Sequence, residues 1–433
     1  MYGIEGNPGD KIGNKIVLSD DGSIIAFSSR SGLRTVNNQN RYGFVSVYKN
    51  TNGVWTKIGN DLVGNDAIDG TLAVSLSADG SIVAFSCHTG LIGYNVQIFK
   101  NNSGQWDPIG QLHYSSPPNS TIPVTFYFGW SISLSADGSA IAISDVSGYV
   151  IICKYQNGNW LPVGNAIVGN LTQEDFGFRV VLSGDGNTVA ISTRTSDKAG
   201  TDSGRVQIYK YNGTSWLQVG NDILGEAAGD VFGQGLVMSE NGNVLAVGSY
   251  GSDTPNGIDT GKIRIFENIK GNWIEKGSIL GTNAGDQIAW SIAMSKDGNS
   301  LLIGNPGSNG NALKPKNIPE EQIVEENLLQ SGNNQAKGTL GGPAQVFNLS
   351  GILSSNTFVL ESFKIYPNPT TDFLNIELGN GLILNKVSIY NTNGQLIKQT
   401  TEKTINMNGL DKGIYHVQVL TNKGYATQKV ILN

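Results

Sequence analysis

Cysteine and histidine are scarce, with only two cysteines and three histidines in 433 residues. No Cys-x-x-Cys pair and no His/Cys/Asp cluster with zinc-like spacing occurs, so the sequence predicts no transition-metal site. Cys153 stands where other repeats carry an aromatic residue, which favours a small apolar filler inside a strand. A disulfide between Cys87 and Cys153 stays open, and cysteine usage does not settle the cellular compartment.

Basic charge and long hydrophobic runs are also lacking. Charged residues make up 15% of the chain, the net charge is −6 and the isoelectric point is near 5.2. This balance excludes nucleic acid and an anionic membrane surface as partners, since either needs a basic face. No apolar run approaches the length of a membrane-spanning helix. No glycine-rich loop joins a strand to a helix as a phosphate site requires.

Glycine, in contrast, is abundant, and a short phrase that ends in glycine recurs six times. The phrase is Ser-x-Asp-Gly, with Asn in place of Asp in one copy, and Leu or Met precedes it. Its glycines are Gly22, Gly80, Gly138, Gly186, Gly242 and Gly298. Their spacing of 48 to 58 residues lies in the range of propeller blades.

Each phrase lies between two apolar runs, which predicts a tight hairpin of type I′ with positive φ at both central residues. The serine hydroxyl is expected to hydrogen-bond the turn backbone. A catalytic reading of these serines would need a base beside one of them, and no histidine recurs nearby. The phrase therefore predicts a turn and not an active site.

The best-defined repeat predicts four strands, at residues 178–182, 188–192, 205–209 and from 216 onward. A Trp-x-x-[Ile/Val]-Gly signature opens the fourth strand, at Trp55, Trp106, Trp160, Trp216 and, with Lys276 in place of the aliphatic residue, Trp273. One Trp per repeat at one register indicates packing between blades. Small residues nine positions before the turn glycine suit a crowded inner strand, and acidic residues three positions earlier are expected to ring one face. These acidic residues are Asp10, Glu174, Asp230 and Asp286.

We therefore predict an all-β chain with a six- to seven-bladed β-propeller over residues 1–350, a linker over 351–362 and a small immunoglobulin-like β-sandwich over 363–433. The sixth repeat has no Trp strand, so residues 352–360 or an upstream segment must close the ring. No signal peptide precedes Ile4, and we expect a chain truncated at its N-terminus. One further N-terminal repeat would give seven blades. Residues 319–330 predict a short helix capped by Asn317.

Several repeats resemble the FG-GAP repeat of integrin-α-like β-propellers. The residues that carry the resemblance are Asp230-Val231-Phe232-Gly233, then 238–242 and 245–250. Calcium-binding copies of that repeat have an Asp-x-Asp-x-Asp-Gly loop, which none of the six turns has. We expect no cofactor, and calcium elsewhere on the propeller stays an open alternative. The resemblance implies a surface or secreted binding module.

The last 71 residues closely resemble the type A C-terminal sorting domain of the type IX secretion system. The matching residues are Tyr366, Pro367, Asn368, Pro369, Gly394, Gly413, Tyr415 and Lys429. The resemblance implies the type IX machinery as a partner. It also implies a location outside the cell or on the outer-membrane surface of a Gram-negative bacterium.

Loops of unequal length on an otherwise equal scaffold are where propellers place function. We expect the connections between the second and third strands, and between the fourth and next first strand, to form the ligand face. Its candidate residues are Asp197, Asp202, Asp253, Asp259, Asp230 and Asp286. The leading hypothesis is a monomeric, non-catalytic adhesion module that binds a glycan or a protein. A hydrolase that uses two loop carboxylates and a structural surface-layer component are the alternatives, and turn capping explains the same aspartates without chemistry.

Overall fold

The computed structural model describes residues 4, 6–36, 39–64, 71–88, 94–113, 128–146, 148–169, 174–304, 314–316, 344–349, 363–379, 381–391, 396–421 and 424–433. Within these ranges every regular element is a strand, and no helix is long and apolar enough to cross a membrane. The described residues form two compact units, one up to residue 346 and one from residue 347. The predicted helix at 319–330 and linker at 351–362 lie outside the described residues.

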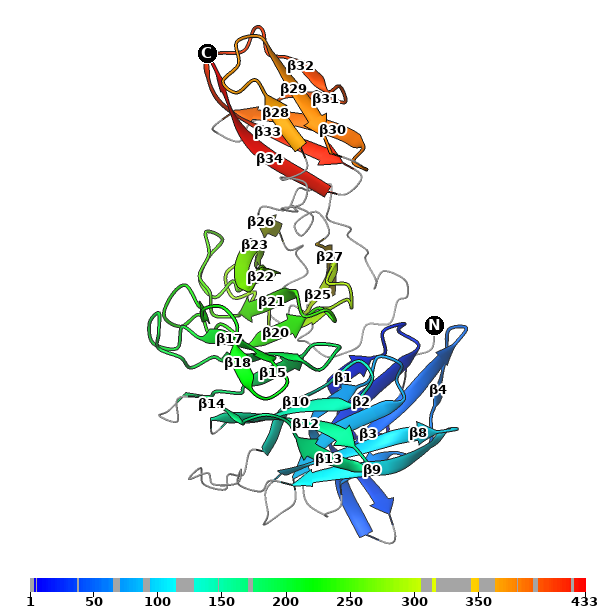
Figure 1. Cartoon of the computed structure of the whole chain (residues 1–433). Helices are drawn as coiled ribbons and strands as arrows, with labels where there is room; N and C mark the ends of the chain where they lie inside the picture. Colours follow the sequence, from blue (N-terminus) through cyan, green and yellow to red (C-terminus); the bar gives the residue numbers. More distant parts are fainter. Residues whose placement is uncertain are drawn as a thin grey trace. The chain divides into compact units, whose positions relative to one another are not determined.

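The first unit is a series of antiparallel sheets that follow one another along the chain (Figure 1). The first three are β1 (Ile12–Leu18), β2 (Ile24–Val36), β3 (Gln39–Thr51), β4 (Val54–Lys57) and β5 (Leu62–Val63); then β6 (Thr71–Leu76), β7 (Ile82–His88), β8 (Tyr94–Asn102) and β9 (Gln105–His113); then β10 (Phe128–Leu134), β11 (Ala140–Asp145), β12 (Tyr149–Gln156), β13 (Asn159–Pro162) and β14 (Ile167–Val168). In each sheet four strands pair in chain order, and the short β5 and β14 pair with the third strand.

Three further sheets complete the series. They are β15 (Arg179–Leu182), β16 (Thr188–Thr193), β17 (Arg205–Tyr211), β18 (Trp216–Gln218) and β19 (Ile223–Leu224); then β20 (Gly235–Met238), β21 (Val244–Ser249), β22 (Lys262–Ile269), β23 (Asn272–Leu280) and β26 (Lys314–Lys316); then β24 (Ser291–Met294), β25 (Ser300–Gly304) and β27 (Ala344–Asn348). The four strands predicted in the fourth repeat are confirmed. The sixth sheet has three strands among the described residues, and residues 352–360 lie outside them.

Backbone hydrogen bonds link the six turns in series. In each bond the N–H of the variable residue of one Ser-x-Asp-Gly turn donates to the carbonyl of the same residue in the next turn. The bonds run Asp20→Ala78, Ala78→Ala136, Ala136→Gly184, Gly184→Glu240 and Glu240→Lys296, at 2.7–2.9 Å. An ion pair of 3.3 Å between Lys296 Nζ and Asp20 Oδ2 joins the last turn to the first. The six sheets are therefore blades around one axis, which confirms the propeller prediction.

The turn geometry differs from the expected type I′. In the first copy the Gly22 N–H donates to the Ser19 carbonyl at 2.9 Å, and only Gly22 of these turn residues has positive φ, at 68°. The φ pattern fits a type I turn followed by a left-handed glycine. The expected role of the serine is confirmed, because Ser19 Oγ accepts from the Ile24 N–H at 2.9 Å and donates to Asp21 Oδ1 at 2.7 Å. The same two bonds recur in the other five turns.

The tryptophans pack between blades, as predicted. The Trp216 indole N–H donates to the Val163 carbonyl of the preceding blade at 2.9 Å, and Trp106 makes the same bond to Ile58. The signature glycine of one blade packs against the Trp of the next blade. A Cβ added to Gly164 would lie 2.9 Å from Cδ1 of Trp216. The same contact between a signature glycine and the next Trp occurs at the first four blade junctions.

The second unit has a buried core between two sheets, as expected for a β-sandwich. One sheet contains β28 (Phe363–Tyr366), β29 (Phe373–Leu378) and β32 (Thr404–Asn406); the other contains β31 (Leu396–Thr400), β30 (Leu384–Asn391), β33 (Gly413–Thr421) and β34 (Gly424–Leu432). The core is aliphatic apart from the buried Tyr415 and Met407. Inward and outward residues alternate along β33, so His416 faces out between Tyr415 and Val417.

Neither cysteine forms a disulfide. Cys153 lies in the apolar cluster between the second and third blades, which confirms the filler prediction, and burial raises the pKa of its thiol to about 12.

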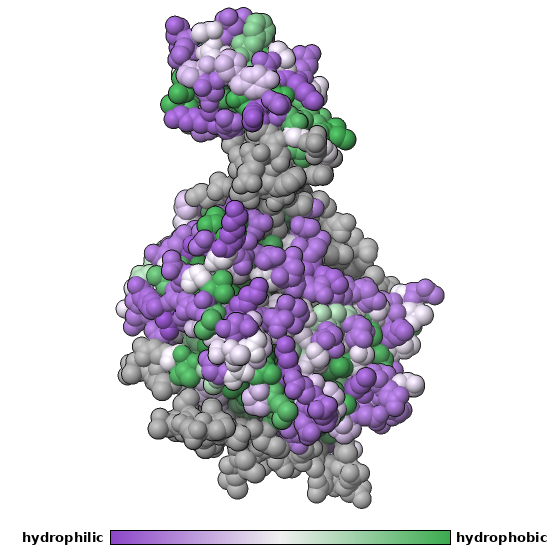
Figure 2. All heavy atoms as spheres, in the orientation of Figure 1, coloured by the Kyte–Doolittle hydropathy of each residue, from purple (hydrophilic) through white to green (hydrophobic). Residues whose placement is uncertain are grey.

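Hydrophilic side chains predominate on the face shown in Figure 2, broken by small hydrophobic areas.

Candidate functional site

The predicted loop aspartates bond within their own loops. Asp197 Oδ1 accepts from the Asp202 backbone N–H at 2.9 Å, and Asp253 Oδ1 accepts from the Asp259 N–H at 2.9 Å. Asp202 and Asp259 adopt left-handed backbone conformations, with φ of 52° and 50°. Asp and Asn tolerate this region better than most residues. The carboxylates of Asp197 and Asp253 therefore shape their loops, while Asp202 and Asp259 contribute backbone N–H groups and left-handed conformations.

The predicted ring of acidic residues is also engaged. Asp230 is buried, and its carboxylate accepts from the Glu226 and Ala227 N–H groups and from Ser252 Oγ. Asp286, only 2% exposed, caps the Thr282 and Asn283 N–H groups in the same way. Asp10 pairs with Arg34 at 3.0 Å, and Glu174 pairs with Arg205 at 2.7 Å. Within the described ranges, no group of three or more His, Cys, Asp or Glu side chains could hold a metal ion.

The loops nevertheless share one rim of the propeller. The carbonyl of Asp202 in the fourth blade accepts from the Val231 N–H of the fifth, and Asp259 accepts in the same way from Gln287 of the sixth. Each loop between a second and third strand thus lies against the entry to the next blade. The first strands begin at this rim, while the Ser-x-Asp-Gly turns follow their other ends.

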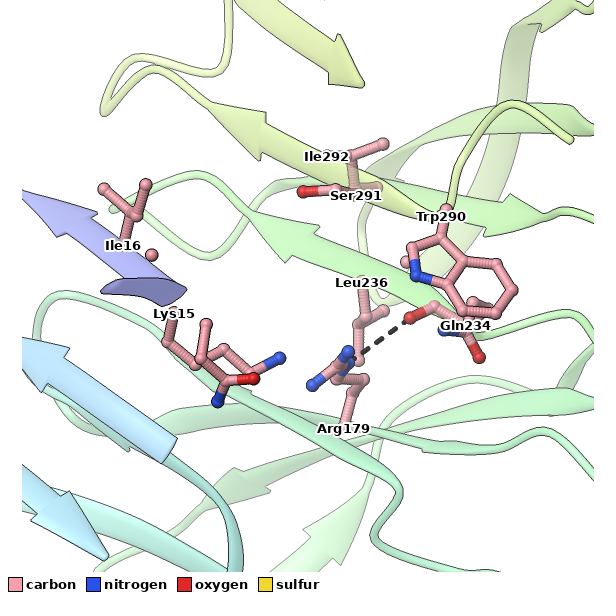
Figure 3. A pocket seen from close by; sticks show the side chains of 11 residues that line it. Lys15, Ile16, Arg179, Gln234, Leu236, Trp290, Ser291 and Ile292 are labelled. Carbon is pink, nitrogen blue, oxygen red and sulfur yellow. Dashed lines mark hydrogen bonds between the residues drawn. The ribbon is translucent and has the colours of Figure 1, made fainter. Parts of the chain in front are cut away.

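A pocket of about 420 Å³ lies where four first strands begin (Figure 3). Its volume is within the range of roughly 300–1,000 Å³ that small-ligand sites occupy. Residues from blades one, four, five and six line it: Gly13, Asn14, Lys15, Ile16, Arg179, Gln234, Gly235, Leu236, Trp290, Ser291 and Ile292. Because these blades lie around the ring, the pocket lies on the propeller axis.

Lys15 and Arg179 occupy the same repeat position. Each follows the small residue of its first strand by two positions, and its backbone N–H donates to the serine of the adjacent second strand. These bonds are Lys15 N to Ser28 Oγ at 3.2 Å and Arg179 N to Ser192 Oγ at 3.0 Å. The other four blades carry small residues here: Ala73, Ser131, Gly235 and Ser291. Blades one and four are opposite in a ring of six, so the two cations face one space that small residues leave open.

The two cations have no acidic neighbour in the pocket lining. Arg179 Nε donates to the Gln234 carbonyl at 3.3 Å, and its guanidinium carbon lies 5.0 Å from the centre of the Phe178 ring. Burial and the nearby Arg179 charge lower the pKa of Lys15 to about 8. Burial and Arg194 lower the pKa of Arg179 from its usual range. Mutual repulsion without a counter-charge favours the arrival of an anion.

An aromatic pair stands at the same pocket. Trp290 lines it and is 48% exposed, and its ring centre lies 4.9 Å from that of Tyr250. The Tyr250 ring packs against the indole at an angle of 57°, and Figure 3 shows the Trp290 side chain at the edge of the pocket near Gln234. A held, exposed indole presents a flat apolar surface with a polar N–H.

The sequence analysis did not identify Lys15, Arg179 or Trp290. The signal was present, since the position two residues after the recurrent small residue reads Lys, Ala, Ser, Arg, Gly and Ser across the repeats. Two cations among four small residues at one inner-strand position indicate a charged channel. The acidic residues are the stronger signal in the sequence because they recur at one repeat position, whereas a cation occurs at the inner-strand position in only two of the six repeats.

The second unit explains several of the predicted sorting residues. Asn368 donates from Nδ2 to the Lys429 carbonyl at 2.8 Å and accepts from the Ile431 N–H at 3.0 Å. The Tyr366–Pro367 and Asn368–Pro369 peptides on either side are cis. Tyr415 is buried and its hydroxyl donates to the Asp411 carbonyl, while Gly413 has φ of 154° and Gly394 lies outside the described residues. The motif thus fastens the start of the domain to its last strand.

Comparisons with known proteins support the prediction of a sorting domain at the C-terminal end of the chain. Residues 364–433 match the family model described as the secretion system C-terminal sorting domain. An ulvan lyase of Nonlabens ulvanivorans is 36% identical over 89 residues, which cover 19% of this chain and 16% of that enzyme.

Two solved structures are similar in their backbone. A putative 6-phosphogluconolactonase from Bacteroides uniformis has a TM-score of 0.46 and 15% identity, covering 70% of this chain and 84% of its own. The β-propeller domain of Cps50 (Swd1) from Myceliophteria thermophila has a TM-score of 0.45 and 12% identity, covering 70% and 81%. The family match supplies the assignment: residues 364–433 of this chain are a secretion-system C-terminal sorting domain, a signal for export to the cell surface or the medium.

Proposed function

We propose that this exported protein is a non-catalytic binding module that holds a glycan at the axial pocket of its propeller. The observation that carries the proposal is the exposed Trp290 indole, supported by Tyr250 at the edge of a 420 Å³ pocket. An exposed, fixed aromatic face suits the apolar face of a sugar ring, and the surrounding backbone and amide groups offer hydrogen bonds to hydroxyls.

Binding without catalysis fits the side chains at this place. None of the described lining residues carries a carboxylate, whereas glycoside hydrolysis uses two across the scissile bond. Two of the loop aspartates predicted as candidates, Asp197 and Asp253, use their carboxylates to accept from the backbone of their own loops. The partial match to an ulvan lyase is compatible with a polysaccharide ligand, although it covers only 16% of that enzyme.

A glycan array probed with the full chain tests this proposal, followed by calorimetry on the best ligands. Trp290→Ala is expected to weaken binding at least about 10-fold, since a well-packed aromatic anchor contributes roughly 2 kcal/mol. Tyr42→Ala is the control, because Tyr42 is a comparably exposed aromatic of the first blade outside the pocket lining. The proposal is contradicted if the chain binds a protein but no glycan. It is also contradicted if the Trp290→Ala variant binds the glycan as tightly as the parent protein.

A further inference from the structure

We propose that the axial pocket selects acidic glycans, because Lys15 and Arg179 together bind one carboxylate or sulfate group of the ligand. This inference rests on the proposed function and adds the chemical class of the ligand. Both cations line the pocket from opposite blades, and their side chains point into the same space (Figure 3).

Arg179 differs from the other buried or half-buried arginines of the propeller. Arg34 pairs with Asp10 and Asp61, Arg194 with Asp175, Arg205 with Glu174 and Asp222, and Arg264 with Glu226 and Glu275. Within the described ranges the Arg179 guanidinium has only the Gln234 carbonyl and the Phe178 ring as partners. Arginine is always charged and offers five donors in a fixed fork. Most of those donors are available to a ligand.

Arg179 is also held in place before any ligand arrives. The Phe178 ring contacts two guanidinium groups, with the Arg194 carbon 3.9 Å and the Arg179 carbon 5.0 Å from its centre. Arg194 is itself neutralised by Asp175 at 2.6 Å, and it reaches the Gln234 side chain at 3.4 Å. A cation that is already oriented loses less conformational entropy on binding.

Lys15 supplies the second charge. It is half-buried, and no ion pair joins its ammonium to another residue in the part of the chain that the structure describes. The lowered pKa of about 8 reflects burial and the Arg179 charge. An anion between the two cations would remove this repulsion, so the same contact satisfies both side chains. The net charge of the whole chain is −6, so a cationic pocket differs from the rest of the protein. An anionic ligand is therefore attracted to this pocket in preference to other parts of the surface.

Oligogalacturonate and its methyl ester provide a matched pair of probes, because methylation removes the carboxylate charge and leaves the sugar rings and their linkages unchanged. We expect the acid to bind at least about 10-fold more tightly than the ester, since hydrogen bonds to charged groups are roughly twice as strong as neutral ones. The preference is expected to fall as salt rises from 50 to 500 mM, while ester binding stays constant. A sulfated neutral oligosaccharide and its unsulfated parent test the sulfate source in the same way.

Lys15→Met and Arg179→Gln remove one charge each and keep most of the side-chain volume. Each is expected to remove most of the preference for the acid over the ester. Lys210→Ala is the control, because Lys210 is exposed on β17 of the fourth blade and outside the pocket lining. If either variant fails to fold, the salt dependence of the parent protein still decides the question.

The outcomes separate this inference from the proposed function. Equal binding of acid and ester, unaffected by either variant, overturns the anion site and leaves the glycan function standing. Binding of inorganic sulfate that depends on Arg179, with no glycan bound, supports the anion site and overturns the glycan function. If neither sulfate nor an acidic oligosaccharide binds at 50 mM salt, the anion site is wrong.

Discussion

Asp197 and Asp202 are joined by a hydrogen bond of 2.9 Å, from the Asp202 backbone N–H to Asp197 Oδ1. Asp253 and Asp259 repeat this relationship one blade later at the same distance. The carbonyls of Asp202 and Asp259 in turn accept from the next blade. Each leading carboxylate therefore supports a loop that is itself part of a blade junction.

Asp197→Ala and Asp253→Ala are each expected to destabilise the propeller by about 1 kcal/mol, because each leaves a loop N–H without its acceptor. Asn at either position keeps an acceptor oxygen and is expected to cost less. Denaturant unfolding and hydrogen exchange of the loop amides measure the effect, with the exposed Asp107→Ala as control. If the Ala variants keep full stability but lose ligand binding, the sequence-based prediction of a loop ligand face is right and the capping role is minor.

The turn glycines give a sharper stability test. Gly80 has φ of 71°, and a Cβ there would lie 2.5 Å from Ile24 Cδ1 of the preceding blade. Gly80→Val is expected to cost at least about 3 kcal/mol, because it adds left-handed strain for a β-branched residue to overpacking of a blade junction. Gly53→Val is the matched control, since Gly53 has φ of 86° but nothing within 4 Å of the added Cβ. Thermal unfolding that shifts equally for both would show that the Ile24 contact is unimportant.

Much of this fold could be predicted because its turns and junctions repeat. Ser19 and Gly22 recur with their neighbours in six copies, so local hydrogen bonding alone marks the hairpins. The type I′ prediction was wrong because Asp-Gly occurs both in type I′ turns and in type I turns followed by a left-handed glycine. The hydrogen bond from the Gly22 N–H to the Ser19 carbonyl selects the second geometry. The alternation of apolar residues does not distinguish them.

The pocket could not be predicted from the sequence, because the residues that line it are far apart in the chain. Lys15 and Arg179 are 164 positions apart in the chain, and they come together only because six blades place the first opposite the fourth. The sequence alone is compatible with six or seven blades, and in a ring of seven the first and fourth blades are not opposite. The loop aspartates were visible because each pair lies in one short loop that also contains a glycine, and the hydrogen bonds of Asp197 and Asp253 within these loops are equally local.

Acid is expected to weaken the propeller through its turn carboxylates. Hydrogen bonds from Ser19 and from Ser23 lower the pKa of Asp21 to about 2, and the Ser295 hydroxyl leads the lowering for Asp297. At Asp79, Asp137 and Asp185 burial opposes the serine and backbone hydrogen bonds, but the pKa is still lowered. Because these pKa values are depressed in the folded state, the stabilisation is full above about pH 4 and is lost as the pH falls toward 2.

Melting temperature between pH 5 and pH 2 measures this effect, and Asn variants provide the comparison. The fifth turn already carries Asn241, whose Oδ1 accepts from Ser239 Oγ at 2.8 Å, so Asn keeps the turn geometry. Asp21→Asn combined with Asp297→Asn is expected to flatten the decline between pH 4 and 2. A decline identical to that of the parent protein would place the acid sensitivity elsewhere.

The blade junctions differ in one hydrogen bond, which allows a matched comparison. Trp216 donates to the Val163 carbonyl at 2.9 Å, whereas the buried Trp160 N–H has no hydrogen-bond partner among the described residues. Trp216→Phe is expected to cost about 2 kcal/mol, through the lost volume and an unsatisfied carbonyl. Trp160→Phe removes an unsatisfied donor, so it is expected to cost less despite similar burial. Chemical denaturation of both variants decides between this account and one based on packing volume alone, which predicts equal losses.

Asn368 is expected to be needed for efficient export. Its side chain makes two hydrogen bonds to β34, to the Lys429 carbonyl and from the Ile431 N–H, so it holds the first strand region of the sorting domain against the last. Asn368→Ala removes both and is expected to destabilise this domain by about 1–2 kcal/mol. The measurement is the exported fraction of the full chain in a host with the secretion machinery, with deletion of residues 363–433 as the complete loss. Asn408→Ala is the control, because Asn408 is exposed in the same domain and its side chain makes no hydrogen bond to the residues that the structure describes. Normal export of Asn368→Ala beside failed export of the deletion would show that the machinery reads the domain without this brace.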